Sequence, residues 1–315
     1  MVFLNFNDIK KINLNVLKSI VAIGNFDGMH LGHQHLLKKL KEHSEKSNAK
    51  SVVIIFEPQP KEFFLKSKSP KRIMPLMEKL NFLNSWQIDE VICLNFDKNL
   101  SKLPGKDFVS NFLINKLFMK KIIVGDDFSL GYKREINAKN LKNLGKFKNF
   151  EIIKLKALKE NEIRISSTYI RNLLQQGNLS LANYFLGKEY ILSGTVKFGK
   201  QKGRTIGFPT INIPIFFSTP LSGVYVVKIY IKQNIFNGIA NIGKNILLDN
   251  KYLLEVHILN FNENLYGQYV KVSFLKFLRK QKKFKNLQEL KIQLTKDKIL
   301  ALQYLEIYDK KNQRL

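Results

Sequence analysis

The 315 residues of this chain are enough for one large domain or two ordinary ones, each with its own buried core. A single cysteine, Cys93, excludes an intrachain disulfide, and no run approaches the ~20 apolar residues that span a bilayer. Lysine and arginine number 53 against 25 aspartates and glutamates, a net charge of +28 that suggests nucleic acid, an acidic membrane or anionic small molecules as partners.

The positive charge is spread along the whole chain, which favours a general bias of composition over a binding footprint, because a footprint would concentrate on one face. The one dense cluster, residues 276–285 (KFLRKQKKFK), is typical of a solvated edge or loop. We therefore expect neither a nucleic acid nor a membrane as partner. Residues 1–11 lack the basic start and apolar core of a signal peptide, and Cys93 lies in an apolar run, so we expect a cytoplasmic protein.

Short apolar runs alternate with helix-like segments over the first 186 residues. Strands are predicted over 20–23, 51–57, 90–96, 121–127 and 150–155, and helices over 36–46, 74–86 and 106–117. This alternation predicts an α/β fold, a mostly parallel, doubly wound sheet with helices on both faces. In such sheets ligands gather at the carboxyl ends of the strands.

The first predicted strand ends in GNFDGMHLGH, residues 24–33. A strand, tight turn and helix present free backbone N–H groups and the positive end of the helix dipole, and Gly28 and Gly32 let an anion approach the backbone. His30 and His33 are three residues apart, so on a first helical turn they share a face and can both donate to phosphate oxygens. The alternative is that both histidines cap the helix or lie on the surface.

Two later segments extend this prediction. Residues 125–128 (GDDF) follow the apolar strand run 122–124 at the same edge of the sheet. Residues 165–171 (ISSTYIR) precede a predicted helix that ends near Gly177, and their hydroxyls can either cap this helix or hold a phosphate together with its free N–H groups. Arg171 adds a forked donor on the same side.

Strands with a period of two dominate beyond residues 186–189. The predicted strands are 191–198, 223–231, 235–242, 252–260 and 269–277, and a helix over 286–305 follows. Short strands with hairpin-length gaps predict a small antiparallel barrel. We therefore expect one domain over residues 1–186 and a second over 187–315.

The segment 199–212 (GKQKGRTIGFPTIN) is glycine-rich and basic, and a loop of this composition can fold over the phosphates of a nucleotide. Thr210 and Asn212 are two apart on an extended segment, so they face the same way and suit a hard cation such as Mg²⁺; a plain polar β-edge is the alternative. Alternation puts Glu255 on the polar face of its strand, where it is either an exposed residue or a general base beside a substrate hydroxyl.

The strings GNFDGMHLGH and ISSTYIR resemble two motifs of the adenylyltransferase half of bacterial riboflavin kinase/FAD synthetase, within the H-x-G-H nucleotidylyltransferase superfamily. The resemblance implies a Rossmann-like domain that joins FMN to ATP, with His30 and His33 catalytic, FAD as product, and flavin binding by Pro58, Asp127 and Phe128. The residues that it implies for ATP are Gly24, Asn25, Phe26, Asp27, Gly28, His30, Gly32, His33, Ser166, Ser167, Thr168 and Arg171.

The second half is similar to the riboflavin kinase domain, through GRTIGFPTIN, SGVY, LEVH and LYG in consecutive order. This resemblance implies Mg-ATP-dependent phosphorylation of riboflavin to FMN, with Glu255 as the base and Thr210 and Asn212 at the metal. The residues that it implies for the nucleotide are Gly199, Gly203, Arg204, Gly207, Pro209, Thr210 and Asn212.

Three positions depart from the family pattern. Gln59 stands where histidine is usual, Leu130 where an aromatic is common, and Ile246-Leu247 where Pro-Thr is usual. The third lies in the kinase domain, so one alternative is an enzyme with a single working half. The other is a basic RNA- or DNA-binding protein on a nucleotide-binding scaffold; it predicts binding with a steep salt dependence.

Overall fold

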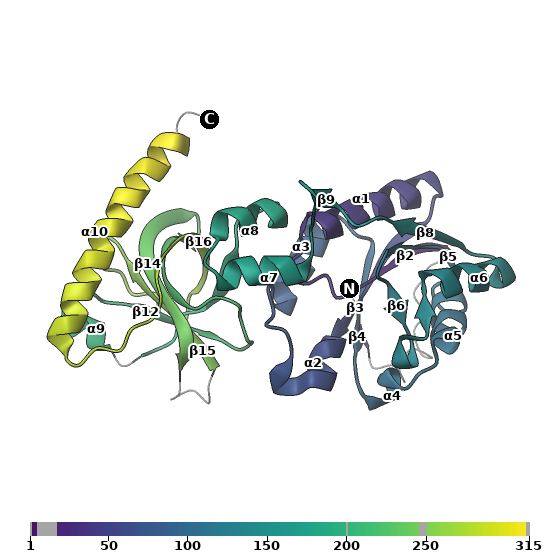
Figure 1. The fold of residues 1–315 in the computed structure, drawn as a ribbon, viewed down its shortest axis with the longest axis horizontal. Helices are drawn as coiled ribbons and strands as arrows, with labels where there is room; N and C mark the ends of the chain where they lie inside the picture. Colours follow the sequence, from purple (N-terminus) through teal and green to yellow (C-terminus); the bar gives the residue numbers. More distant parts are fainter. Residues whose placement is uncertain (1, 5–17, 200, 246–250, 313–315) are drawn as a thin grey trace. The chain divides into compact units, whose positions relative to one another are not determined.

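The computed structural model describes residues 2–4, 18–199, 201–245 and 251–312 (Figure 1). It contains two compact units, the first formed by Met1–Pro70 and Met74–Ser167 and the second by Lys71–Ile73 and Thr168–Leu315. The domain boundary that we predict at residue 187 directly follows helix α8 (Leu179–Leu186) and stays a prediction.

The first unit is built on a six-stranded parallel sheet in the order β1-β4-β3-β2-β5-β8. The strands are β1 (Val2–Leu4), β2 (Ser19–Ile23), β3 (Lys50–Glu57), β4 (Glu90–Asn95), β5 (Met119–Gly125) and β8 (Glu151–Leu155). Strand order reverses between β2 and β5, and this switch point is where doubly wound sheets bind ligands. The predicted α/β architecture is confirmed.

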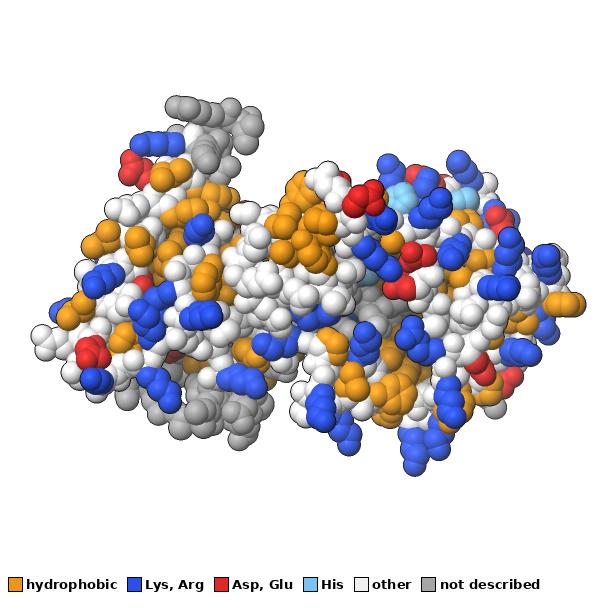
Figure 2. Space-filling model, in the orientation of Figure 1, with side chains coloured by type: hydrophobic (Ala, Val, Ile, Leu, Met, Phe, Trp, Pro, Cys, Tyr) orange, Lys and Arg blue, Asp and Glu red, His pale blue; other side chains and the backbone are white. Residues whose placement is uncertain are grey.

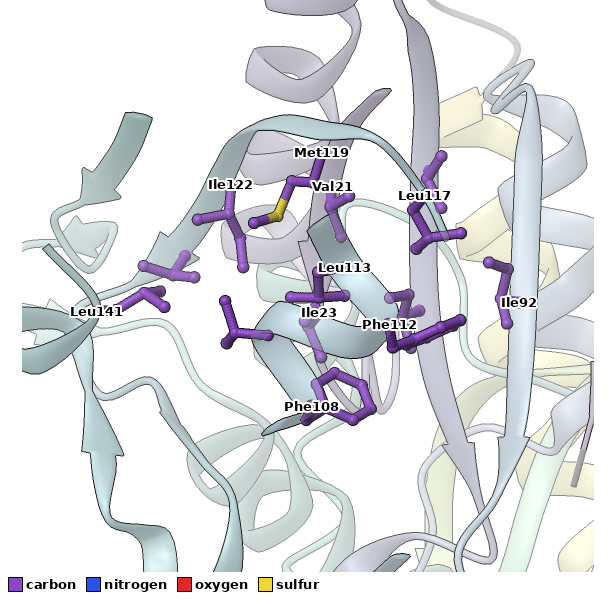
Figure 3. Packing of buried hydrophobic residues seen from close by; sticks show 14 of the residues in the cluster. Val21, Ile23, Ile92, Phe108, Phe112, Leu113, Leu117, Met119, Ile122 and Leu141 are labelled. Atoms are coloured by element: carbon purple, nitrogen blue, oxygen red, sulfur yellow. The ribbon is translucent and has the colours of Figure 1, made fainter. Parts of the chain in front are cut away.

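Both faces of this sheet are apolar, so helices cover both. Along β2, Val21 and Ile23 belong to one buried cluster and Ile20 and Ala22 to another. Figure 3 shows the first cluster, in which Phe112 packs close to the strands. The helices of this unit are α1 (Leu31–Lys46), α2 (Pro60–Leu65), α3 (Leu76–Ser85), α4 (Lys98–Ser101), α5 (Gly105–Asp107) and α6 (Ala138–Lys148), with the π-helical segment η3 (Phe108–Ile114).

Several elements of this unit differ from the sequence predictions. Helix α1 begins at Leu31 rather than at residue 36, because His30 caps it. The helix predicted over 106–117 is instead the short α5 followed by the π-helical η3. Strand β1 was not predicted; it pairs in parallel with β4, and three residues are too few to show a hydrophobic period.

The second unit is a six-stranded antiparallel sheet in the order β11-β16-β13-β14-β15-β12. An antiparallel bridge between Lys197 and Asn212 joins the segment after the first edge strand to the other edge, so the sheet curls into a nearly closed barrel, as predicted. Its strands are β11 (Ile191–Thr195), β12 (Ile211–Ile215), β13 (Gly223–Ile231), β14 (Asn234–Asn245), β15 (Lys251–Ile258) and β16 (Tyr269–Arg279).

Helix α10 (Leu287–Asn312) extends beyond the predicted end at residue 305 and packs on the outside of the barrel. Ala301 and Leu305 join a buried cluster with strand residues. Arg279 of β16 donates from Nη2 to Asp297 Oδ2 at 2.7 Å, so this member of the basic cluster is half-buried in an ion pair instead of solvated. Helix α7 (Ser167–Gln175) precedes α8.

Lysine and arginine side chains scatter over the face drawn in Figure 2 and do not gather into one patch. This distribution agrees with a general compositional bias. Within the described ranges, no helix has the length and apolar character needed to cross a membrane.

Candidate active sites

The first site is the turn that follows β2 at the switch point of the parallel sheet. Phe26 (φ 49°), Gly28 (φ 85°) and Met29 (φ 49°) all have positive φ, a region that costs a side-chain-bearing residue about 1–2 kcal/mol. Phe26 and Met29 are fully buried in the core, and this burial stabilises the conformation. Gly28 reaches it without a steric penalty.

Neighbouring elements hold this turn by hydrogen bonds. Lys79 Nζ on α3 donates to Asn25 O at 2.6 Å, and Met74 N donates to Asp27 Oδ1 at 3.2 Å. Ser167 Oγ, at the start of α7, donates to Asp27 O at 2.8 Å. The structure therefore brings Ser167 of the ISST motif to the GNFDG turn. The sequence analysis did not single out Lys79. Its position on the buried face of α3, beside Leu80 and Leu83, is a feature of the sequence that could have indicated it.

The two histidines lie against each other, as predicted. His30 caps α1, its Nδ1 accepts from His33 N at 3.3 Å, and the two rings stack with centroids 3.6 Å apart. Burial, reinforced by the positive charge of Arg164, lowers the pKa of His30 to about 4, while the contact with its own backbone opposes this. His30 is therefore neutral at pH 7, and because Nδ1 accepts, its single donor is Nε2–H.

Arg164 is a residue of this edge that sequence reasoning missed. On β10 (Ile163–Arg164), it contacts both acidic residues of the GDDF segment, with Nη2 2.9 Å from Asp126 Oδ1 and 2.9 Å from Asp127 Oδ2. Asp127 is largely exposed, and Phe128 packs partly against the core. Asp127, one of the predicted flavin-binding residues, thus lies next to a cation.

The loop after β3 carries Pro58 and Gln59, a departure from the family pattern. Gln59 caps α2, its backbone N donates to Glu62 Oε2 at 2.9 Å, and its side chain is buried. Its Nε2 has no hydrogen-bond partner among the described residues. Leu130, another departure, packs against the same core as Phe128, so an apolar side chain suffices there.

Helix α7 carries Thr168 and Arg171, which the sequence predicts for the phosphate site. It begins at Ser167, inside the ISST motif, so Ser166 precedes the helix and Thr168 lies in its first turn. Arg171 lies one turn further on, and its Nε donates to Lys71 O at 2.6 Å. Hydroxyls and free N–H groups at a helix start suit an anion.

The second site lies on the barrel, where three polar side chains occupy adjacent strands in register. Asn212 on β12 faces Glu255 on β15, and Glu255 faces Asn241 on β14. Asn241 Nδ2 donates to Glu255 Oε2 at 3.1 Å, and Gln281 Nε2 donates to Asn241 Oδ1 at 3.0 Å. The predicted alternation is confirmed, because Leu254 and its apolar neighbours on β15 are buried while Glu255 is half-buried. Asn241 and Gln281 were not predicted.

The segment before β12 folds closely onto it. Residues 202–205, predicted as loop, form the one-turn helix α9 (Lys202–Thr205), because Phe208 N returns to donate to Gly203 O at 2.8 Å. A Cβ on Gly199 would overlap the Asn212 amide, so any other residue there would displace this side chain. Four residues of this segment that the resemblance implies for nucleotide binding are exposed to solvent: Arg204, Gly207, Pro209 and Thr210.

His257 fixes the other side of this segment. Its Nδ1 lies 2.8 Å from Pro209 O, and its ring packs against Phe208. Burial lowers the pKa of His257, partly offset by this contact with the carbonyl, so the neutral imidazole that donates from Nδ1 is favoured. His257 therefore anchors the residues that lead into Thr210.

Few side chains of the barrel site could bind a metal ion. Among the described residues no three His, Cys, Asp or Glu side chains gather as ligands. The Asn212 amide instead offers a hard oxygen at the position facing the Glu255 carboxylate, and the exposed Thr210 hydroxyl lies two residues before it in the chain. These oxygens fit Mg²⁺, which is usually held by one or two protein groups together with substrate phosphates.

Two family models match the chain in succession, FAD synthetase over residues 13–169 and riboflavin kinase over residues 186–305. A protein of Buchnera aphidicola subsp. Schizaphis graminum, named bifunctional riboflavin kinase/FMN adenylyltransferase, is 42% identical across 96% of this chain and 97% of its own. The chain belongs to the bifunctional riboflavin kinase/FMN adenylyltransferase family.

Other members of this riboflavin kinase/FMN adenylyltransferase family are similar over nearly as much of the chain. The Escherichia coli K12 protein is 38% identical across 90% of this chain and 92% of its own. A crystal structure described as a macrolide-efflux protein from Streptococcus pneumoniae is 29% identical, with a TM-score of 0.80 across 96% of this chain and 99% of that one. This structural likeness covers both folds described above.

Proposed function

We propose that this chain phosphorylates riboflavin to FMN on its barrel and then adenylylates FMN to FAD on its parallel α/β unit, using one ATP in each reaction. The observation that carries the proposal is the presence of two separate polar sites, each on a scaffold matched by the family model for one of these activities. Membership of a family with both activities supports it.

On the barrel, Glu255 accepts the proton of the terminal ribityl hydroxyl, whose oxygen attacks the γ-phosphorus of ATP while the bond to ADP breaks. Asn241 holds the carboxylate toward this reaction by its amide donor. Asn212 and Thr210 would hold Mg²⁺, which neutralises phosphate charge. The segment around α9 covers the nucleotide, with Gly203, Arg204 and Gly207 lining it.

On the α/β unit, an oxygen of the FMN phosphate attacks the α-phosphorus of ATP, and the bond to pyrophosphate breaks. No protein nucleophile is needed, so catalysis consists of alignment and stabilisation of charge. His30 donates from Nε2 as a neutral imidazole, and His33 lies stacked beside it. The turn over 24–28 and the hydroxyl of Ser166 complete the site for phosphate, while Ser167 holds the turn by donating to Asp27 O.

We assign the flavin of this second reaction to the side of Asp127, Phe128 and Pro58, and we place both reactions in the cytoplasm, where the buried free thiol of Cys93 persists. The predicted cofactor is Mg²⁺, and the predicted partners are riboflavin, FMN and ATP.

The test is to incubate the purified chain with riboflavin, ATP and Mg²⁺ and to separate the flavins over time. We expect FMN to appear first and FAD to follow. FMN without FAD, or FAD only from supplied FMN, would leave the alternative of a single working half. That alternative rests on Ile246-Leu247, the departure in the kinase domain, which lies outside the described residues. Neither product would contradict the proposal.

A further inference from the structure

A buried lysine lies directly behind the turn of the α/β unit. The side chain of Lys79 on α3 is fully buried, with 0% exposed, and its Nζ donates to Asn25 O at 2.6 Å. A buried ammonium is costly unless its charge and hydrogen bonds are satisfied. A lysine at this position on the apolar stripe of an amphipathic helix therefore has a specific function at the turn, beyond filling space.

The bond to Asn25 O fixes the orientation of one peptide group at the start of the turn. In a trans peptide the C=O and N–H point in opposite directions, so the contact turns the Phe26 N–H away from Lys79. The residues that follow are in strained conformations, with positive φ at Phe26 and Met29. Such conformations persist only where the surroundings hold them. Lys79 and Met74, both from the α3 region, hold the turn from one side and Ser167 from the other.

The charges around this turn give Lys79 a second role. The buried Asp27 carboxylate belongs to the same turn, and His30 is neutral at pH 7. A triphosphate that enters here meets a buried negative charge and a neutral imidazole. Lys79 and Asp27 are both buried at this turn, so an ammonium at Lys79, away from solvent screening, offsets charge on Asp27.

We propose that Lys79 is a positioning residue for adenylyl transfer: it fixes the Asn25–Phe26 peptide and balances the charge of Asp27, so that the turn accepts the phosphates of ATP. The inference rests on the proposed function of the α/β unit. Lys79 acts through the turn and is not itself in contact with substrate.

The test replaces the ammonium with an apolar group of similar length, Lys79→Met. We expect the KM for ATP in FAD formation to rise about tenfold to a hundredfold, as for loss of a charged hydrogen bond, while the KM for FMN stays near that of the unmodified chain. FMN formation by the barrel of the same polypeptide stays unchanged. The matched control is Lys39→Met, since Lys39 pairs with Glu42 on the surface of α1; it leaves both reactions unchanged.

A general loosening of the unit gives a different result, because it raises the KM of both substrates together; that outcome overturns the proposal. Fluorescence of Trp86, the single tryptophan, reports whether the unit is folded. If Lys79→Met does not fold, Lys79→Arg keeps the charge and Lys79→Gln keeps only a donor. We then expect the ATP KM to increase from the unmodified chain to arginine to glutamine.

Kinetics equal to the unmodified chain in a folded Lys79→Met or Lys79→Gln variant overturn the role of Lys79 and leave the proposed function intact. An unmodified chain that forms no FAD from FMN and ATP contradicts the proposed function itself. The two failures are therefore distinguishable in one set of assays.

Discussion

Asn212 and Glu255 occupy facing positions on the antiparallel strands β12 and β15. Strand partners on one face have Cβ atoms about 4.5–5.5 Å apart, so the proposed metal ligand and the proposed base meet there without any contribution from flexible segments. The sheet itself thus positions the groups that we propose for the kinase reaction. The next strand adds Asn241 at the same level.

Glu255→Ala tests the base. We expect FMN formation to fall by about 10²–10⁴-fold, the usual contribution of a positioned base, because no other carboxylate occupies this register position. FAD formation from supplied FMN should stay unchanged. Separate assays of the two half-reactions measure both, and FMN formation at the normal rate would rule out Glu255 as the base.

Asn241→Leu tests the group that holds the base. Loss of the amide donor at 3.1 Å leaves the Glu255 carboxylate without one hydrogen bond, and we expect kcat of riboflavin phosphorylation to fall about tenfold or more. Asn234→Leu, at the exposed start of the same strand, is the control and should keep the full rate. Equal rates in the two variants would contradict this role.

Gly199→Ala tests the close approach to the metal ligand. The added Cβ displaces the Asn212 amide, so we expect a higher Mg²⁺ requirement for FMN formation, with the dependence on metal concentration as the measurement. FAD formation in the same polypeptide is the internal control. An unaltered Mg²⁺ dependence would show that Asn212 is not a ligand.

The pKa of His30 predicts how the stability of the α/β unit depends on pH. Burial lowers this pKa from 6.5 to about 4, so between these values the unfolded chain binds a proton that the folded chain does not. The free energy of unfolding of this unit therefore keeps its full value above pH 6.5 and decreases as the pH falls. At pH 5 the decrease is on the order of 2 kcal/mol. Urea unfolding followed by Trp86 fluorescence measures it. A His30→Gln variant should lose less over the same interval, and an equal loss would contradict the assignment.

Sequence patterns predicted the scaffold well and the supporting residues poorly. The strands were predicted because their apolar periods are long, whereas β1 has only three residues and is defined by its pairing with β4. The start of α1 depends on capping by His30, and α9 is closed by the hydrogen bond from Phe208 N to Gly203 O. Neither feature produces a hydrophobic period in the sequence. Both are set by local hydrogen bonds.

The candidate sites divide in the same way. His30, Asn212 and Glu255 lie in short motifs and were predicted from them. Lys79 and Asn241 are each distant in sequence from the residue that they hold, Asn25 and Glu255, so tertiary packing brings them together. A single sequence carries no direct signal for such pairs.

The most direct measurement of two independent sites mixes two variants, His33→Ala and Glu255→Ala, in equal amounts with riboflavin, ATP and Mg²⁺. Each variant alone should form FAD from riboflavin only in traces, because the first stops at FMN and the second makes little FMN. The mixture should form FAD much faster, because FMN made by one polypeptide is used by the other. FAD formation by either variant alone as fast as by the mixture, or none by the mixture, would contradict the account.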